Sequence, residues 1–91
     1  MNTVSGVLTI CNARGLHARA SAKFVETVEA FDAYAEVGRE GQKVGGDSIM
    51  GLLMLAAGPG CDIEVVCSGT EAEALMTALT SLVSNRFGED S

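Results

Sequence analysis

Residues 6–31 read GVLTICNARGLHARASAKFVETVEAF, and this stretch decides the fold. In residues 6–12 the side chains alternate between two faces, which is typical of a β-strand. The Arg14-Gly15-Leu16-His17 segment breaks the alternation and indicates a loop. From about Ala18 to Phe31 the apolar residues recur with helical spacing. The stretch therefore predicts a strand, a loop and an amphipathic helix, in that order.

The rest of the chain continues this alternation of strands and helices. Residues 33–38 and 61–67 alternate as strands, and a turn after the first predicts a hairpin into a short strand near Lys43–Gly45. A serine precedes a short, very apolar helix over Ile49–Leu55. The Thr70-Glu71-Ala72-Glu73 segment has the pattern of a capping box before a last helix. The order βαββαβα indicates an α+β fold of two layers, with helices on one side of a sheet.

The length and composition exclude several classes of protein. The chain has 91 residues, 47% of them hydrophobic, which predicts one folded domain over residues 1–91. It shows neither an 18-residue apolar run nor a signal-peptide pattern, so we expect no membrane segment. The net charge of -6 argues against nucleic-acid binding. The three cysteines have no metal-binding spacing. We expect them to be small hydrophobes in a cytoplasmic protein that binds no metal.

The charges are unevenly distributed. Residues 1–25 contain Arg14, Arg19 and Lys23 but no acidic residue, whereas all twelve acidic residues follow. The only histidine, His17, lies among these basic residues. A local basic patch in an acidic protein indicates a site for a specific anion, although chance clustering is an alternative.

The position of His17 at a predicted strand-to-helix junction strengthens this interpretation. The first amides of a helix lack internal acceptors and carry partial positive charge, so they attract anions. A largely neutral imidazole is a nucleophile near neutral pH, and histidine forms covalent intermediates in proteins. We expect the ring to face solvent within reach of Arg19. The alternative is a histidine that only caps the helix.

The Gly15-Leu16-His17-Ala18-Arg19 segment resembles the GLHARPA signature of the HPr family, the phosphocarriers of the phosphoenolpyruvate phosphotransferase system. Residues 47–52 resemble the segment around the regulatory serine of that family, and residues 60–65 resemble its last strand. The spacing of the segments and the order of elements match as well. The resemblance implies an HPr-like open-faced β-sandwich, in which three helices cover one face of a four-stranded antiparallel sheet.

The resemblance also implies a function. His17 would accept a phosphoryl group from phospho-enzyme I, on Nδ1, and pass it to a histidine of an enzyme IIA. Arg19 matches the arginine that supports the phosphoryl group, with Ala18 beside it in the phosphate-binding helix start. Ser48 matches the serine modified by HPr kinase/phosphorylase. The partner-binding residues map onto Ile49, Met50 and Leu53. Such a protein is a carrier rather than an enzyme, and we expect a monomer without a cofactor.

Several residues depart from the usual family pattern. Ala20 stands where proline is common, and Asp47 replaces a common lysine beside the serine. Glu26 and Glu29 occupy positions where sugar-branch members often have lysines. Together with residues 85–90, they make the chain more similar to nitrogen-branch, NPr-like members. The alternatives are a sugar-branch carrier, a regulatory HPr-like module that acts through its serine, and a small-molecule-binding regulatory domain of similar fold.

Overall fold

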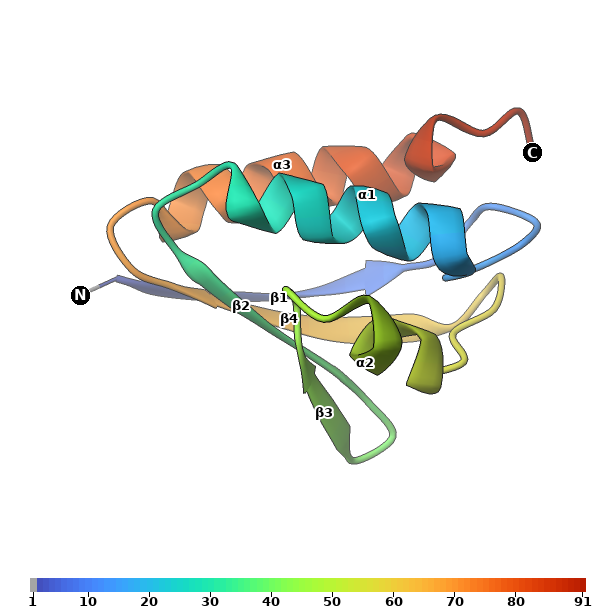
Figure 1. Ribbon diagram of the computed structural model, residues 1–91, viewed down its shortest axis with the longest axis horizontal. Coiled ribbons are helices and arrows are strands. Elements are labelled where there is room, and N and C mark those ends of the chain that lie inside the picture. The colour runs from blue at the N-terminus through green and yellow to red at the C-terminus, as the bar shows by residue number, and fades with distance from the viewer. Residues whose placement is uncertain (1) are drawn as a thin grey trace.

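The computed structural model describes residues 2–91, which form alternating strands and helices (Figure 1). The elements are β1 (Thr3–Thr9), α1 (Ala18–Glu29), β2 (Tyr34–Arg39), β3 (Gln42–Gly45), α2 (Ile49–Met54), β4 (Asp62–Ser68), α3 (Ala72–Ser84) and the 3-10 turn η1 (Arg86–Gly88). The predicted order βαββαβα is confirmed. The turn η1 was not among the predicted elements.

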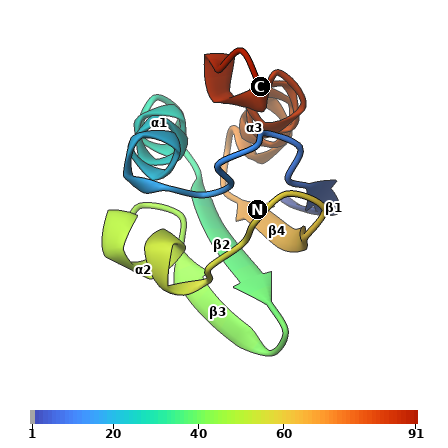
Figure 2. The ribbon, with the colours of Figure 1, turned by 90° about the vertical axis from the view of Figure 1, so that its right-hand side faces the viewer.

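The four strands form one antiparallel sheet in the order β1-β4-β2-β3. The helices lie on one face of this sheet, with α1 and α3 side by side and α2 next to β3 (Figure 2). The opposite face has no covering element among the described residues. This arrangement confirms the predicted open-faced sandwich.

The core is built from alternate residues of the strands and from the apolar faces of the helices, as the sequence predicts. Alternate strand residues such as Val37 and Val65 are fully buried, and Phe24 and Leu79 fill the same core from the helices. Cys67 is also fully buried, and this burial raises the pKa of its thiol. The prediction that the cysteines are buried hydrophobes therefore holds for Cys67 and is wrong for Cys11, which is exposed, while Cys61 is half-buried.

The first strand and the start of the last helix differ from the prediction. β1 spans Thr3–Thr9 rather than residues 6–12, because all seven of its residues pair with β4. The predicted capping box is absent, since α3 begins at Ala72 and its N-cap residue Glu71 makes no side-chain cap. The carboxylate of Glu71 instead accepts the backbone N–H of Asp32 at 2.7 Å. That contact ties the residue before α3 to the loop between α1 and β2.

The remaining boundaries differ from the predicted ones by a residue or two. Across residues 2–91, no helix has both the length and the hydropathy needed to cross a membrane. The same residues contain no group of three histidine, cysteine or acidic side chains arranged to hold a metal ion.

Candidate functional site

The loop between β1 and α1 is held against the chain that enters β4. Ile10 donates its N–H to Cys61 at 2.9 Å and accepts the N–H of Gly60 at 2.7 Å. The N–H of Leu16 donates to the carbonyl of Ala57, also at 2.9 Å. Because Ile10 and Leu16 are both buried, the loop is fixed at both ends. These contacts place the start of α1 at one end of the molecule.

Gly15 makes the turn that brings His17 to the helix start. Its φ of +65° lies in the left-handed region, which glycine adopts without steric cost. Its carbonyl oxygen accepts the backbone N–H of His17 and the side-chain amide of Asn12, each at 2.9 Å. The conformation of Gly15 therefore connects the buried amide of Asn12 to the histidine.

His17 directly precedes α1, as the sequence predicts. It is the N-cap residue, but its side chain makes no capping hydrogen bond. Its backbone is extended, and its carbonyl accepts the N–H of Ser21 at 2.8 Å. The amides of Ala18 and Arg19 are in the first turn, where no intrahelical acceptor is available. These amides can therefore donate hydrogen bonds to an anion. The imidazole of His17 does not take part in capping the helix.

The imidazole of His17 is hydrogen-bonded through Nε2 to a carboxylate oxygen of Glu89. The other carboxylate oxygen accepts the side-chain amide of Asn12 at 3.0 Å. The expectation that the ring faces solvent needs correction, because only 17% of the His17 side chain is exposed. Within residues 2–91, Nδ1 makes no hydrogen bond. Of the two ring nitrogens, Nδ1 is thus the one without a hydrogen-bond partner in the described part of the chain.

The carboxyl group of Glu89 is kept ionised by its neighbours. The hydrogen bond from Asn12, and then the one from His17, holds the pKa of Glu89 below its ordinary value. The charge of Arg14, and that of His17 whenever the ring is protonated, act in the same direction. At neutral pH, Glu89 therefore accepts hydrogen bonds but cannot donate one.

The C-terminal turn carries Glu89 to this position. The side chain of Phe87 is fully buried, and its carbonyl accepts the ammonium group of Lys23 on α1 at 2.6 Å. In Figure 1 the C-terminal end, in red, lies at the same end of the molecule as the start of α1. Neither Asn12 nor Glu89 was predicted from the sequence to be a site residue. The sequence contained one signal for this contact. Phe87 is a single aromatic residue between the polar end of the last helix and the acidic pair Glu89-Asp90, and burying it would bring that pair against the fold.

The predicted basic residues do gather at one place. Arg14, Arg19 and Lys23 line a surface pocket together with residues 88–91. The acidic end of the chain therefore shares this pocket with the basic residues. No hydrogen bond joins the side chains of Arg19 and His17 in the part of the chain that the structure describes. Arg19 and Glu89 line the same pocket, and Glu89 contacts the His17 ring.

Helix α2 presents the other predicted residues. Ser48 caps it, with its hydroxyl oxygen accepting the N–H of Gly51 at 3.0 Å. Ile49 and Met50 are exposed, as partner-binding residues must be, whereas Leu53 is half-buried. Met54 is exposed as well and was missed. We call the exposed apolar residues the α2 patch: Ile49, Met50 and Met54.

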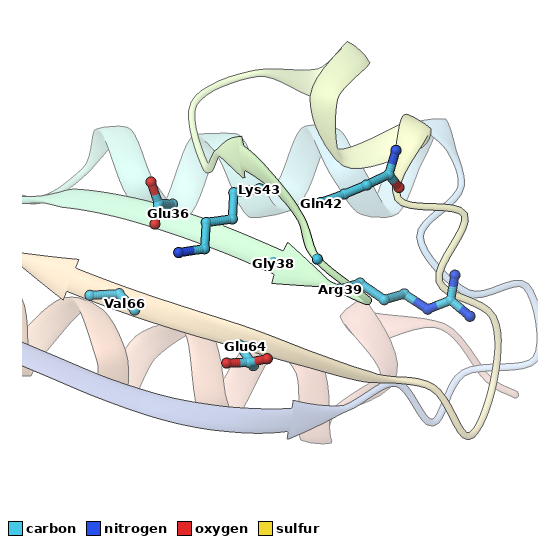
Figure 3. A pocket seen from close by; sticks show the side chains of 8 residues that line it. Glu36, Gly38, Arg39, Gln42, Lys43, Glu64 and Val66 are labelled. Atoms are coloured by element: carbon cyan, nitrogen blue, oxygen red, sulfur yellow. The ribbon is translucent and has the colours of Figure 1, made fainter.

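A different hollow lies on the uncovered face of the sheet, among β2, β3 and β4 (Figure 3). Glu36 and Glu64 line it together with Lys43 and Arg39, so acidic and basic groups are mixed. The loop that carries His17 contributes no residue to it. We therefore place the candidate site at the start of α1.

Comparison with known proteins identifies the family of the chain. Residues 4–85 match the family model for the HPr component phosphorylation site of the phosphotransferase system. The chain belongs to the HPr family of phosphocarriers. Members of this family carry a phosphoryl group between proteins, and the chain is an HPr phosphocarrier of the phosphotransferase system.

Curated HPr relatives and solved HPr structures cover nearly the whole chain. Phosphocarrier protein HPr of Cupriavidus necator is 44% identical over 81 residues, which are 89% of this chain and 91% of the relative. Phosphocarrier protein NPr of Shewanella violacea is 37% identical over 91 residues, the full length of both. The crystal structure of HPr-C-His from Thermoanaerobacter tengcongensis has a TM-score of 0.89 at 34% identity and covers 100% of both chains.

Proposed function

We propose that His17 is the residue that carries the phosphoryl group, which it accepts from phospho-enzyme I and donates to an enzyme IIA. The observation that supports this most strongly is the position of the only histidine at a helix start, with Nδ1 unbonded. We also propose that the protein works as a cytoplasmic monomer, because a carrier must present the same face to successive partners.

The transfer that we propose is an in-line displacement between two histidines. The lone pair of His17 Nδ1 forms a bond to phosphorus while the donor P–N bond breaks, and that electron pair stays on the donor nitrogen. The phosphoryl oxygens then meet the amides of Ala18 and Arg19 and the nearby Arg19 guanidinium. Positioning and charge stabilisation supply most of the catalysis in phosphoryl transfer. The chain itself needs no cofactor for this step.

We propose the nitrogen branch as the cellular role. Glu26 and Glu29 are exposed on α1, so they present negative charge to a docking partner. The full-length similarity to an NPr of Shewanella violacea supports the same role. A role in sugar uptake is the alternative, and the higher identity to HPr of Cupriavidus necator favours it.

Transfer of labelled phosphate tests both the function and the branch. The purified chain is mixed with enzyme I and radiolabelled phosphoenolpyruvate, and the labelled product is then offered equal amounts of a nitrogen-type and a sugar-type enzyme IIA. We expect the chain to be labelled and the nitrogen-type domain to receive the phosphate faster. No label on the chain contradicts the carrier function, and faster transfer to the sugar-type domain contradicts the branch.

Ser48 is proposed as a site of regulation by HPr kinase/phosphorylase. A phosphate there adds about -1.5 to -2 charge beside Asp47 and the α2 patch. We expect Ser48→Asp to accept phosphate from enzyme I several-fold more slowly than Ser48→Ala. The alanine variant lacks both the charge and the cap, and the cap contributes about 1 kcal/mol to helix stability. Equal initial rates of labelling in the two variants would contradict regulation by charge.

The α2 patch is proposed as the surface that docks enzyme I and enzyme IIA. The side chain of Met50 is 69% exposed, so Met50→Ser should change the free energy of unfolding by less than about 0.5 kcal/mol. We expect it to raise the KM for transfer about fivefold or more, as the loss of an apolar anchor does. The matched control is Val7→Ser, since Val7 is 62% exposed on the uncovered sheet face. A KM that is unchanged in Met50→Ser, or raised equally in both variants, would refute docking through this patch.

A further inference from the structure

We propose that Glu89 and Asn12 are positioning residues for His17: Asn12 orients the carboxylate of Glu89, and Glu89 holds the proton of the imidazole on Nε2 so that Nδ1 presents its lone pair. This inference rests on the proposed phosphoryl transfer at His17 and adds two residues to it. It also explains why the end of the chain folds back over the helix start.

The amide of Asn12 is held in one orientation. Asn12 is fully buried, and its Nδ2 donates to the Gly15 carbonyl at 2.9 Å and to Glu89 at 3.0 Å. Its Oδ1 is buried and has no partner within residues 2–91. Rotating the amide by half a turn would place Oδ1 against two acceptors, so both N–H groups point where they do for an electrostatic reason. One of them is therefore aimed at the carboxylate.

Glu89 fixes the tautomer of the imidazole. An ionised carboxylate only accepts hydrogen bonds, so the ring nitrogen opposite it must carry a proton. In a neutral imidazole, a proton on Nε2 leaves the lone pair on Nδ1. Carboxylates that face metal-bound histidines orient the ring and set its tautomer in the same way. In this protein the phosphoryl group on Nδ1 takes the place that the metal has in those sites.

The same contact compensates the charge that forms during the transfer. When Nδ1 bonds to phosphorus and the donor P–N bond breaks, the proton stays on Nε2 and the ring becomes cationic. The carboxylate of Glu89 lies next to that cation and stabilises it. When the phosphoryl group leaves, the P–N electron pair returns to Nδ1 and the ring becomes neutral again. No proton enters or leaves the site in either direction.

The substitution Glu89→Gln gives a distinctive prediction, because a glutamine amide has one acceptor and one donor end. The N–H of Asn12 would face the new carbonyl oxygen, which turns the new amide nitrogen toward Nε2 of His17. An N–H that donates to Nε2 requires the ring proton on Nδ1, the nitrogen that should react. We therefore expect the variant to reverse the tautomer rather than merely weaken the contact. Its rate of phosphate uptake should fall at least about tenfold.

The experiment measures both tautomer and rate in the full chain. The chemical shifts of the ¹⁵N-labelled imidazole report which nitrogen carries the proton, at a pH where the ring is neutral, and the chain has no other histidine to overlap. Labelling from enzyme I and radiolabelled phosphoenolpyruvate reports the rate. The matched control is Glu73→Gln, which removes the same charge by the same substitution at an exposed position in the first turn of α3 that does not line the pocket with Arg19. We expect the wild type and this control to be Nε2-protonated with equal rates.

Asn12 is tested through its coupling to Glu89. Asn12→Ala should slow labelling in the same direction as Glu89→Gln. The double variant should be no slower than Glu89→Gln alone, because the two residues act on the ring through one contact. If Asn12→Ala does not fold, the reversal of the tautomer in Glu89→Gln still decides the proposal.

The outcomes separate this inference from the proposed function. A wild-type chain that takes up no phosphate contradicts the proposed function itself. A labelled wild type, together with a Glu89→Gln variant of unchanged tautomer and rate, overturns the inference and leaves the function standing. A Glu89→Gln variant that is faster than the wild type also overturns it, because the carboxylate would then obstruct the ring.

Discussion

Replacing His17 with alanine is expected to abolish phosphate uptake from phospho-enzyme I completely. The chain contains no second histidine, so no other imidazole can accept the group. The fold should survive, because His17 caps α1 through its backbone and the imidazole makes a hydrogen bond only to Glu89. Labelling by radioactive phosphoenolpyruvate measures the loss, and the unfolding transition verifies that the variant is folded.

The His17→Ala variant should still dock, which distinguishes a lost acceptor from a lost surface. The α2 patch is untouched by the substitution. We therefore expect this variant to inhibit labelling of the wild-type chain competitively, whereas a variant with both His17→Ala and Met50→Ser should inhibit weakly. Any phosphate that remains bound to His17→Ala at the wild-type level would place the acceptor elsewhere.

Gly15→Ala is expected to destabilise the protein and slow phosphate uptake at the same time. A side chain at a φ of +65° costs about 1–3 kcal/mol in backbone strain. A Cβ at this position would also overlap the carbonyl of Ala57 and lie 2.8 Å from the Cα of Gly58. The loop must therefore shift. Because the Gly15 carbonyl holds both Asn12 and His17, that shift should disturb the ring.

Substitutions at two other glycines distinguish backbone strain from steric overlap as the cause of the lost stability. Gly41 has a φ of +86° but open space where a Cβ would lie, so Gly41→Ala measures backbone strain alone. Gly58 has open space and no positive φ, so Gly58→Ala should be nearly neutral. Chemical denaturation gives the three free energies of unfolding. Equal losses for Gly15→Ala and Gly41→Ala would show that the contact with Ala57 contributes nothing.

The sequence predicted the fold well because local patterns determine most of it. The alternation over residues 6–12 puts Leu8 and Ile10 on one face, and the helical spacing puts Phe24 on another apolar face. The structure buries all three residues. The capping box failed for a long-range reason, because Glu71 binds the backbone of Asp32 across the fold. A local motif does not show which distant partner competes for its side chain.

The candidate site likewise has one part that the local sequence predicts and another part that it does not. The place of His17 at a helix start follows from its neighbours in sequence, and so does the cap made by Ser48. Glu89 is 72 positions from His17, and no local pattern links them. It reaches the ring because Phe87 is buried and adopts a positive φ, which reverses the chain after α3. Such a contact depends on tertiary packing, which a single sequence does not reveal.

The identity of the phosphorylated nitrogen tests the central claim most directly. The chain is labelled with ¹⁵N-histidine, phosphorylated by enzyme I and phosphoenolpyruvate, and studied by ³¹P and ¹⁵N NMR. With one histidine, the spectrum contains a single pair of imidazole nitrogens. We predict that phosphorus is coupled to Nδ1 while Nε2 keeps its proton. Phosphorus coupled to Nε2, or to neither nitrogen, would contradict the account.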